Sequence, residues 1–173
     1  MFPDVINGIP AHALYVHAVV VLLPLTAVLL VVSALWPTVM RRLGISLPVL
    51  ALVSLALVPV TTSAGEWLEQ RVQENALVER HAELGEQLLP WAAGLFVVTV
   101  AVWWVYRRAI GNGPTDLRVS WPPMGAVSVP LWIAAVVLAL AVGAGTIVQV
   151  YRIGDSGAQA VWRNAHTSSA QRG

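Results

Sequence analysis

Four apolar stretches, each long enough to cross a lipid bilayer, account for most of this chain. A hydrocarbon core about 30 Å thick requires about 20 helical residues. The predicted spans cover residues 13–36, 45–67, 84–106 and 124–151. Each span is predicted to be a helix, because its apolar residues do not alternate as in a half-buried strand and because backbone groups in lipid must bond internally. The predicted fold class is all-α, an integral membrane four-helix bundle.

The composition agrees with lipid as the surrounding medium. Only 11% of the 173 residues are charged, about half the usual fraction in a soluble domain. The chain is long enough for one bundle, residues 1–163, followed by residues 164–173 as a flexible polar tail. Cysteine is absent, which excludes disulfides, thiolate ligands and iron–sulfur clusters. The net charge of +1 gives no reason to expect nucleic acid, so the expected partner is the lipid bilayer.

Prolines interrupt three of the spans. Pro24, Pro59 and Pro90 each remove one hydrogen bond of the helical ladder and crowd the preceding turn. Membrane helices tolerate such positions where a neighbouring group bonds to the freed carbonyl. Kinks are therefore expected at all three prolines.

The placement of arginines predicts how the bundle faces. Four spans put both termini on one side of the membrane, and the loops after the first and third spans on the other. Pairs of arginines lie directly at the ends of these two spans, namely Arg41, Arg42, Arg107 and Arg108. Basic residues in short loops favour the cytoplasmic side. The predicted topology is a multi-pass protein of the cell inner (plasma) membrane with both the N-terminus and the C-terminus outside.

All four histidines fall on the predicted outer side: His12, His17, His81 and His166. An ionisable group at the depth of a span end costs several kcal/mol unless it is paired, hydrated or bound to a ligand. The middle of each span holds no ionisable residue, which argues against an ion pump or a transmembrane proton relay. Any chemistry is therefore expected at the outer end.

The first functional hypothesis is a haem b held between the first and third spans. Two neutral imidazoles from different helices can bind an iron from both faces of the porphyrin, and His17 and His81 are the predicted axial ligands. Gly85, one turn after His81, would leave room for the porphyrin edge, and Arg80 would pair with a propionate. This hypothesis implies electron transfer with a membrane or periplasmic redox protein. In the alternative, His17 bonds within the protein near the interface and His81 is solvated.

The second hypothesis is a divalent metal site for zinc or copper. The available ligands have the types that these ions prefer; they are His12, His17, His81, Glu66 and Glu83. However, His12 and His17 are five residues apart, which places them on different faces of a continuous helix. No His-Glu-x-x-His motif occurs. In the haem hypothesis, His12, Glu66 and Glu83 would instead surround the cofactor or line its entrance.

The third hypothesis involves no cofactor. The outer face would then dock a partner, and the protein would be an accessory or scaffold subunit of a larger membrane complex. Glu79, Glu83 and Glu86 form one acidic stripe of the helix that leads into the third span. A solvated helix surface explains the same stripe. No phosphate-binding glycine loop or nucleophile motif of a soluble enzyme occurs in the chain.

Several segments carry a family resemblance: residues 6–12 (INGIPAH), 16–25 (VHAVVVLLPL), 63–69 (SAGEWLE), 77–86 (LVERHAELGE) and 152–158 (RIGDSGA). Through them the chain resembles the domain-of-unknown-function 2231 family of uncharacterised bacterial membrane proteins. The resemblance covers nearly the whole chain and implies a four-helix membrane domain. Some family members occur beside electron-transfer modules or fused to them, so the resemblance favours the haem hypothesis.

Overall fold

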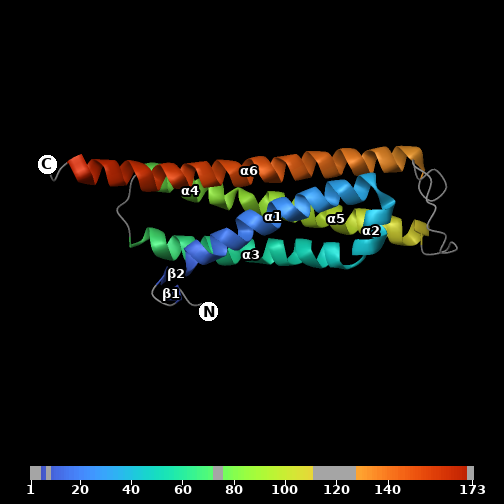
Figure 1. Ribbon diagram of the computed structural model, residues 1–173, viewed down its shortest axis with the longest axis horizontal. Helices are drawn as coiled ribbons and strands as arrows, with labels where there is room; N and C mark the ends of the chain where they lie inside the picture. The colour runs from blue at the N-terminus through green and yellow to red at the C-terminus, as the bar shows by residue number, and fades with distance from the viewer. Residues whose placement is uncertain (1–4, 7–8, 72–75, 111–127, 171–173) are drawn as a thin grey trace.

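The computed structural model describes residues 5–6, 9–71, 76–110 and 128–170. Within these residues four helical segments are long and apolar enough to cross a membrane, and they lie side by side along the long axis of the molecule (Figure 1). They are α1 (Ala11–Leu35), α3 (Ser46–Glu69), α4 (Ala76–Glu86) together with α5 (Leu88–Ile110), and α6 (Val129–Ala170). The predicted all-α four-helix membrane fold is confirmed.

Short elements complete the architecture. The strands β1 (Val5–Ile6) and β2 (Ile9–Pro10), each of two residues, form an antiparallel pair before α1. The helix α2 (Pro37–Leu43) links α1 to α3 and ends at Gly44, whose positive φ of 50° suits a residue without a Cβ. In Figure 1 the start of α1 and the end of α6 lie at one end of the bundle, and α2 lies at the other.

The helix bounds can be set beside the predicted spans. The predicted third span, residues 84–106, covers the last residues of α4 and most of α5. The first residues of the predicted fourth span, 124–127, lie outside the described residues. α6 continues to Ala170, into the predicted tail, because no proline or glycine between Ala158 and Ala170 interrupts it. The last tail residues, 171–173, lie outside the described part of the chain.

The third crossing is built from two helices because of a proline. α4 ends at Glu86 and α5 begins at Leu88. Pro90 has no N–H to donate to the carbonyl of Glu86, four residues before it, and its ring crowds that carbonyl. Gln149 of α6 donates to the nearby carbonyl of Leu84 at 2.9 Å. A side chain from a neighbouring helix thus bonds to the backbone beside the break, whereas the other two predicted kink positions lie inside unbroken helices.

The interior of the bundle is apolar, with a few paired hydroxyl groups. Leu23, Leu30 and Leu95 are fully or almost fully buried. Thr26 of α1 and Ser54 of α3 are also buried, and their hydroxyl oxygens lie 3.2 Å apart. Each hydroxyl also lies within hydrogen-bonding distance of the carbonyl four residues earlier in its own helix, so one of the two can donate to the other while the second donates to its own carbonyl. These hydroxyl groups therefore leave no unbonded donor between the two helices.

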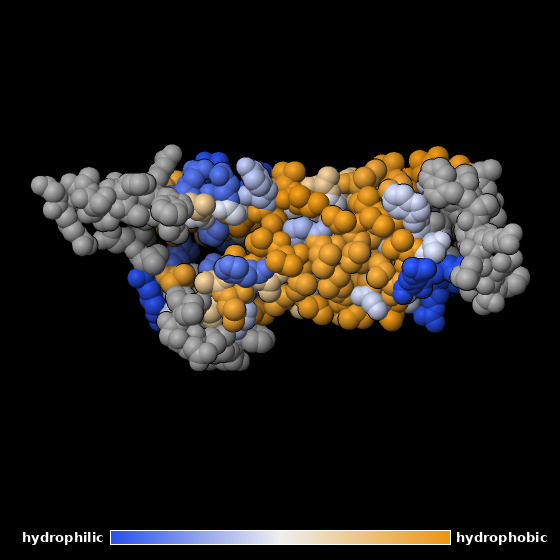
Figure 2. Space-filling model, viewed as in Figure 1, coloured by the Kyte–Doolittle hydropathy of each residue, from blue (hydrophilic) through white to orange (hydrophobic). Residues whose placement is uncertain are grey.

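The outer surface of the bundle is apolar as well. Val21, Val97 and Val137 are each more than half exposed. Figure 2 shows apolar side chains over the middle of the molecule, with hydrophilic side chains towards its two ends. A bundle that is apolar inside and outside has lipid as its surrounding medium, so the protein is a multi-pass membrane protein in contact with the bilayer.

Candidate functional site

Two histidines face one another across a small cavity at the end of the bundle where α1 begins. The ring centroids of His12 and His81 lie 6.5 Å apart, and the ring planes are perpendicular. Both rings line a cavity of about 60 Å³ to which α1, α3, α4, α5 and α6 all contribute. The rest of its lining is mainly apolar and comprises Val16, Val19, Val20, Val58, Thr61, Thr62, Gly85, Leu88, Val150 and Ile153.

His12 is fixed by α3. It is the second residue of α1, and its Nδ1 lies 3.0 Å from the carbonyl oxygen of Thr61. Gly65 follows Thr61 by four residues, and a Cβ at Gly65 would lie only 3.0 Å from Cε1 of His12. A helical side chain leans back over the carbonyl four residues earlier. Glycine at position 65 therefore keeps the Thr61 carbonyl accessible to the imidazole.

His81 is fixed by α6 in the same way. Its Nδ1 lies 3.1 Å from the carbonyl oxygen of Ile153 and 3.0 Å from the hydroxyl oxygen of Ser156. The Ser156 hydroxyl donates to the Ile153 carbonyl at 2.8 Å, so it accepts from the imidazole. Gly157 follows Ile153 by four residues, and a Cβ there would lie 3.0 Å from Cε1 of His81. The combination of histidine, helical carbonyl and glycine thus occurs twice.

These contacts determine which ring nitrogen carries the proton. A carbonyl oxygen can only accept a hydrogen bond, so Nδ1 must be the donor in both His12 and His81. In the neutral imidazole, Nε2 then keeps its lone pair. Histidines that bind a metal ion through Nε2 commonly donate Nδ1–H to a backbone carbonyl in this manner. Both rings therefore have the tautomer that leaves Nε2 free to bind a metal ion.

His17 lies elsewhere. It is exposed on α1, and its Nδ1 donates to the carbonyl of Ala13 in the same helix. It does not line the cavity between His12 and His81. Because α1 is helical from Ala11 onward, five residues turn the His17 side chain about 140° away from that of His12. The structure brings His81 together with His12, and not with the predicted partner His17.

The other predicted site residues divide into two groups. Gly85 lines the cavity, and a Cβ added there would meet no atom within 4 Å, so there is open space beside it. Arg80, Glu66 and Glu83 are exposed and do not line the cavity. Within the described ranges no three His, Asp or Glu side chains come close enough to hold a metal ion together. The proposed five-ligand set for zinc or copper is thus not gathered at one point.

Sequence reasoning missed the residues that orient the imidazoles. The acceptors are the backbone carbonyls of Thr61 and Ile153, which no side-chain pattern shows. Gly65 and Gly157 do leave a signal, because each lies within a segment that carries the family resemblance, Gly65 at the end of the predicted second span and Gly157 shortly after the predicted fourth. A search for glycines that expose a helical carbonyl to a histidine would have found them.

Comparison with known proteins supports one assignment. A family model described as predicted membrane protein (DUF2231) matches residues 8–170. Neither a curated protein nor a solved structure matches the chain. The match includes both histidines of the cavity and all four membrane-crossing segments. The chain therefore belongs to the DUF2231 family of predicted membrane proteins.

Proposed function

We propose that this membrane protein binds a redox cofactor, haem b, at the outer end of the bundle, with His12 and His81 as axial ligands. The observation that carries the proposal is the pair of imidazoles that face one cavity with their Nδ1 atoms fixed by carbonyls. A bond from a metal ion to an imidazole nitrogen is about 2.0–2.1 Å long. With about 1 Å from that nitrogen to the ring centre, an ion between opposed rings separates their centroids by about 6 Å. The observed separation of 6.5 Å is close to this value.

The number of available donors favours haem over a bare ion. Structural zinc sites take four protein ligands and catalytic sites three, whereas a porphyrin supplies four donors and leaves only two axial positions to the protein. Two imidazoles, in a described structure where no group of three His, Asp or Glu side chains could hold a metal ion, match the second requirement. The apolar walls formed by Val19 and Val58 and the open space beside Gly85 suit a porphyrin edge.

The volume of the cavity sets a condition on this proposal. At about 60 Å³ it is far smaller than the roughly 300–1,000 Å³ of a typical cofactor pocket. The separation of the two rings suits an iron, but a macrocycle would require side chains that line the cavity, such as Val16, Val20 and Leu88, to move. Movement of those side chains alone, with His12 held by α3 and His81 by α6, would keep the ring separation that suits the iron.

Haem bound there supplies one-electron transfer. The protein's own part would be to supply the Nε2 atoms of His12 and His81 as donors to the iron, to surround the site with apolar side chains, and to keep it near the membrane surface. On the proposed topology, with both termini outside the inner membrane, that surface is the outer one. The expected partner is then a membrane or periplasmic redox protein.

One observation favours a second candidate. The small cavity suits a copper or zinc ion bound by the same two imidazoles, with water completing the coordination. Such an ion needs no movement of the surrounding side chains. Elemental analysis distinguishes it from haem.

The test is the absorbance of the protein purified in detergent from haem-replete cells, in the oxidised and the reduced state. We expect a Soret band and a reduced α band that are lost in His12→Ala and in His81→Ala. His17→Ala is the matched control, because it removes an imidazole of the same helix that lies outside the cavity, and it should keep both bands. Circular dichroism and gel filtration establish that each variant is folded.

Three outcomes would contradict the haem proposal in different ways. A colourless protein with stoichiometric copper or zinc supports the second candidate. A colourless, metal-free protein that co-purifies with a stoichiometric partner supports a cofactor-free accessory subunit. Haem bands that depend on His17 and not on His12 would restore the pairing first expected from the sequence.

A further inference from the structure

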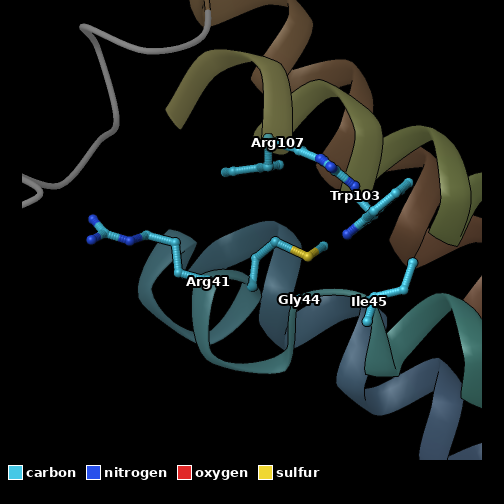
Figure 3. A pocket seen from close by; sticks show the side chains of 7 residues that line it. Arg41, Gly44, Ile45, Trp103 and Arg107 are labelled. Carbon is cyan, nitrogen blue, oxygen red and sulfur yellow. The ribbon is translucent and has the colours of Figure 1, made fainter. Parts of the chain in front are cut away.

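A second cavity lies at the opposite end of the bundle, where α2, the start of α3 and the end of α5 meet (Figure 3). Its volume is about 320 Å³, which is within the range of ligand pockets. The residues that line it are Met40, Arg41, Gly44, Ile45, Trp103, Tyr106 and Arg107. None of them belongs to the histidine site.

The end of the bundle that holds this cavity is basic. Arg41 and Arg42 lie in the last turn of α2, and Arg107 and Arg108 lie in the last turn of α5. Every acidic residue in the described part of the chain lies on α3, α4 or α6 at the histidine end. This end of the bundle, with Arg41 and Arg107 at the rim of the cavity, therefore has an uncompensated positive charge among the described residues.

The floor of the cavity is apolar, and its rim lies where a membrane–water interface is expected. Both Ile45, which is more than half exposed, and Met40, which is buried, line the cavity. The Arg107 guanidinium lies 5.2 Å from the centroid of the Trp103 ring, and Figure 3 shows it extending towards that ring. Tryptophans beside arginines at a span end mark the level of the lipid headgroups.

The two guanidinium groups flank the cavity from different helices. Figure 3 shows the Arg41 side chain on the α2 side, pointing away from Trp103. Arginine side chains are long and flexible, and they keep their charged end at the interface while their stems lie along apolar surface. A rotation of Arg41 about its own side-chain bonds brings its charge to an anion at the mouth of the cavity. A phosphate oxygen is the acceptor that matches guanidinium geometry best.

We propose that this cavity binds one anionic phospholipid, with its phosphate at Arg41 and Arg107 and the start of an acyl chain along Ile45 and Trp103. A basic rim above an apolar floor matches a molecule that has both parts, and basic pockets between membrane helices recognise anionic headgroups in this way. The lipid fills the space between the α2 turn and α5. The proposal is independent of the cofactor at the other end.

The test uses the full chain purified in detergent, mixed with equal amounts of phosphatidylglycerol and phosphatidylcholine and measured by native mass spectrometry. We expect one retained phosphatidylglycerol and little phosphatidylcholine. The double variant Arg41→Gln/Arg107→Gln should weaken phosphatidylglycerol binding roughly 30-fold. Arg42→Gln/Arg108→Gln is the matched control, since it removes the same charge at the same end but outside the lining, and it should retain the lipid.

Several results would overturn the proposal. Equal losses in the two double variants would mean that surface charge attracts lipid without a site. Equal retention of both lipids by the unmodified protein would remove the headgroup preference. Displacement of phosphatidylglycerol by millimolar inorganic phosphate would assign the cavity to a free anion. If the double variant does not fold, the single variants Arg41→Gln and Arg107→Gln supply the same comparison, each with its neighbouring arginine as control.

Discussion

Gly157 allows the histidine site to be tested without removing a ligand. A Cβ at this position would lie 3.0 Å from Cε1 of His81 and 3.2 Å from its Nδ1. Gly154 is three residues earlier on α6, is exposed, and would place a Cβ in open space. Substitution by alanine adds the same methyl group to the same helix at both positions. The two variants therefore differ mainly in what that methyl group meets.

The expected difference in the free energy of unfolding follows from two opposing effects. Alanine in place of glycine stabilises a helix interior by about 0.8–1.0 kcal/mol, and Gly154→Ala should show this gain. At position 157 the methyl group overlaps the imidazole, and overpacking of this kind costs typically 1–3 kcal/mol. The free energies of unfolding of the two variants should therefore differ by about 1–3 kcal/mol. At about 2–4 °C per kcal/mol for a chain of this size, the melting temperatures should differ by roughly 2–12 °C.

The assay is thermal unfolding of each variant in the same detergent, repeated in a His81→Ala background. Without the imidazole, the three atoms nearest to the methyl group at position 157 are removed, so Gly157→Ala should then stabilise about as much as Gly154→Ala does. Equal melting temperatures for the two glycine variants in the unmodified protein would refute the placement of His81 against Gly157. That result would also remove the reason for assigning the proton of His81 to its Nδ1.

Two further predictions concern the interior. Ser54→Ala removes the bond to Thr26 and should lower the free energy of unfolding by about 0.6–1.7 kcal/mol. Ser33→Ala removes a buried hydroxyl that has no hydrogen-bond partner in the described structure, so it should leave stability unchanged or raise it. Equal losses of stability for the two variants in denaturation by SDS would contradict this contrast. Tyr106→Phe removes a donor to the carbonyl of Ala34 near the end of α1, and it should lower the free energy of unfolding by about 0.5–1.5 kcal/mol in the same assay. A loss near zero would show that this hydrogen bond does not stabilise the end of α1.

The four-helix fold could be predicted from the sequence because lipid imposes a simple rule. Each crossing needs about 20 apolar residues, and such runs are visible without knowledge of tertiary contacts. A distortion near the break between α4 and α5 could be predicted as well, because Pro90 lies close to the start of its span. The sequence also predicts that the histidines share one end of the bundle, because the side of the membrane on which a residue lies depends only on the number of crossings before it.

The pairing of the histidines could not be predicted, because it depends on the rotational phase of α1. In a soluble helix, polar residues mark the outer face and fix the phase. In α1 apolar residues occupy every face, so the sequence does not show whether His12 or His17 points inward. The phase is set by contacts with α3, including the bond from His12 to the carbonyl of Thr61. The depth of His17 in its span favours it as a ligand, but depth is a weaker criterion than the direction in which the side chain points.

The repeated arrangement of histidine, carbonyl and glycine determines what a single substitution can show. His12 bonds to α3 and His81 bonds to α6, and no hydrogen bond between the two rings is present in the described structure. Removal of one imidazole therefore leaves the other fixed by its own helix and with the same proton on Nδ1. A bound group that needs both Nε2 atoms should be lost in either variant, while the fold and the remaining ring stay in place. If one histidine proved essential and the other dispensable, the cavity would hold a one-ligand site, and the argument from the 6.5 Å separation would fail.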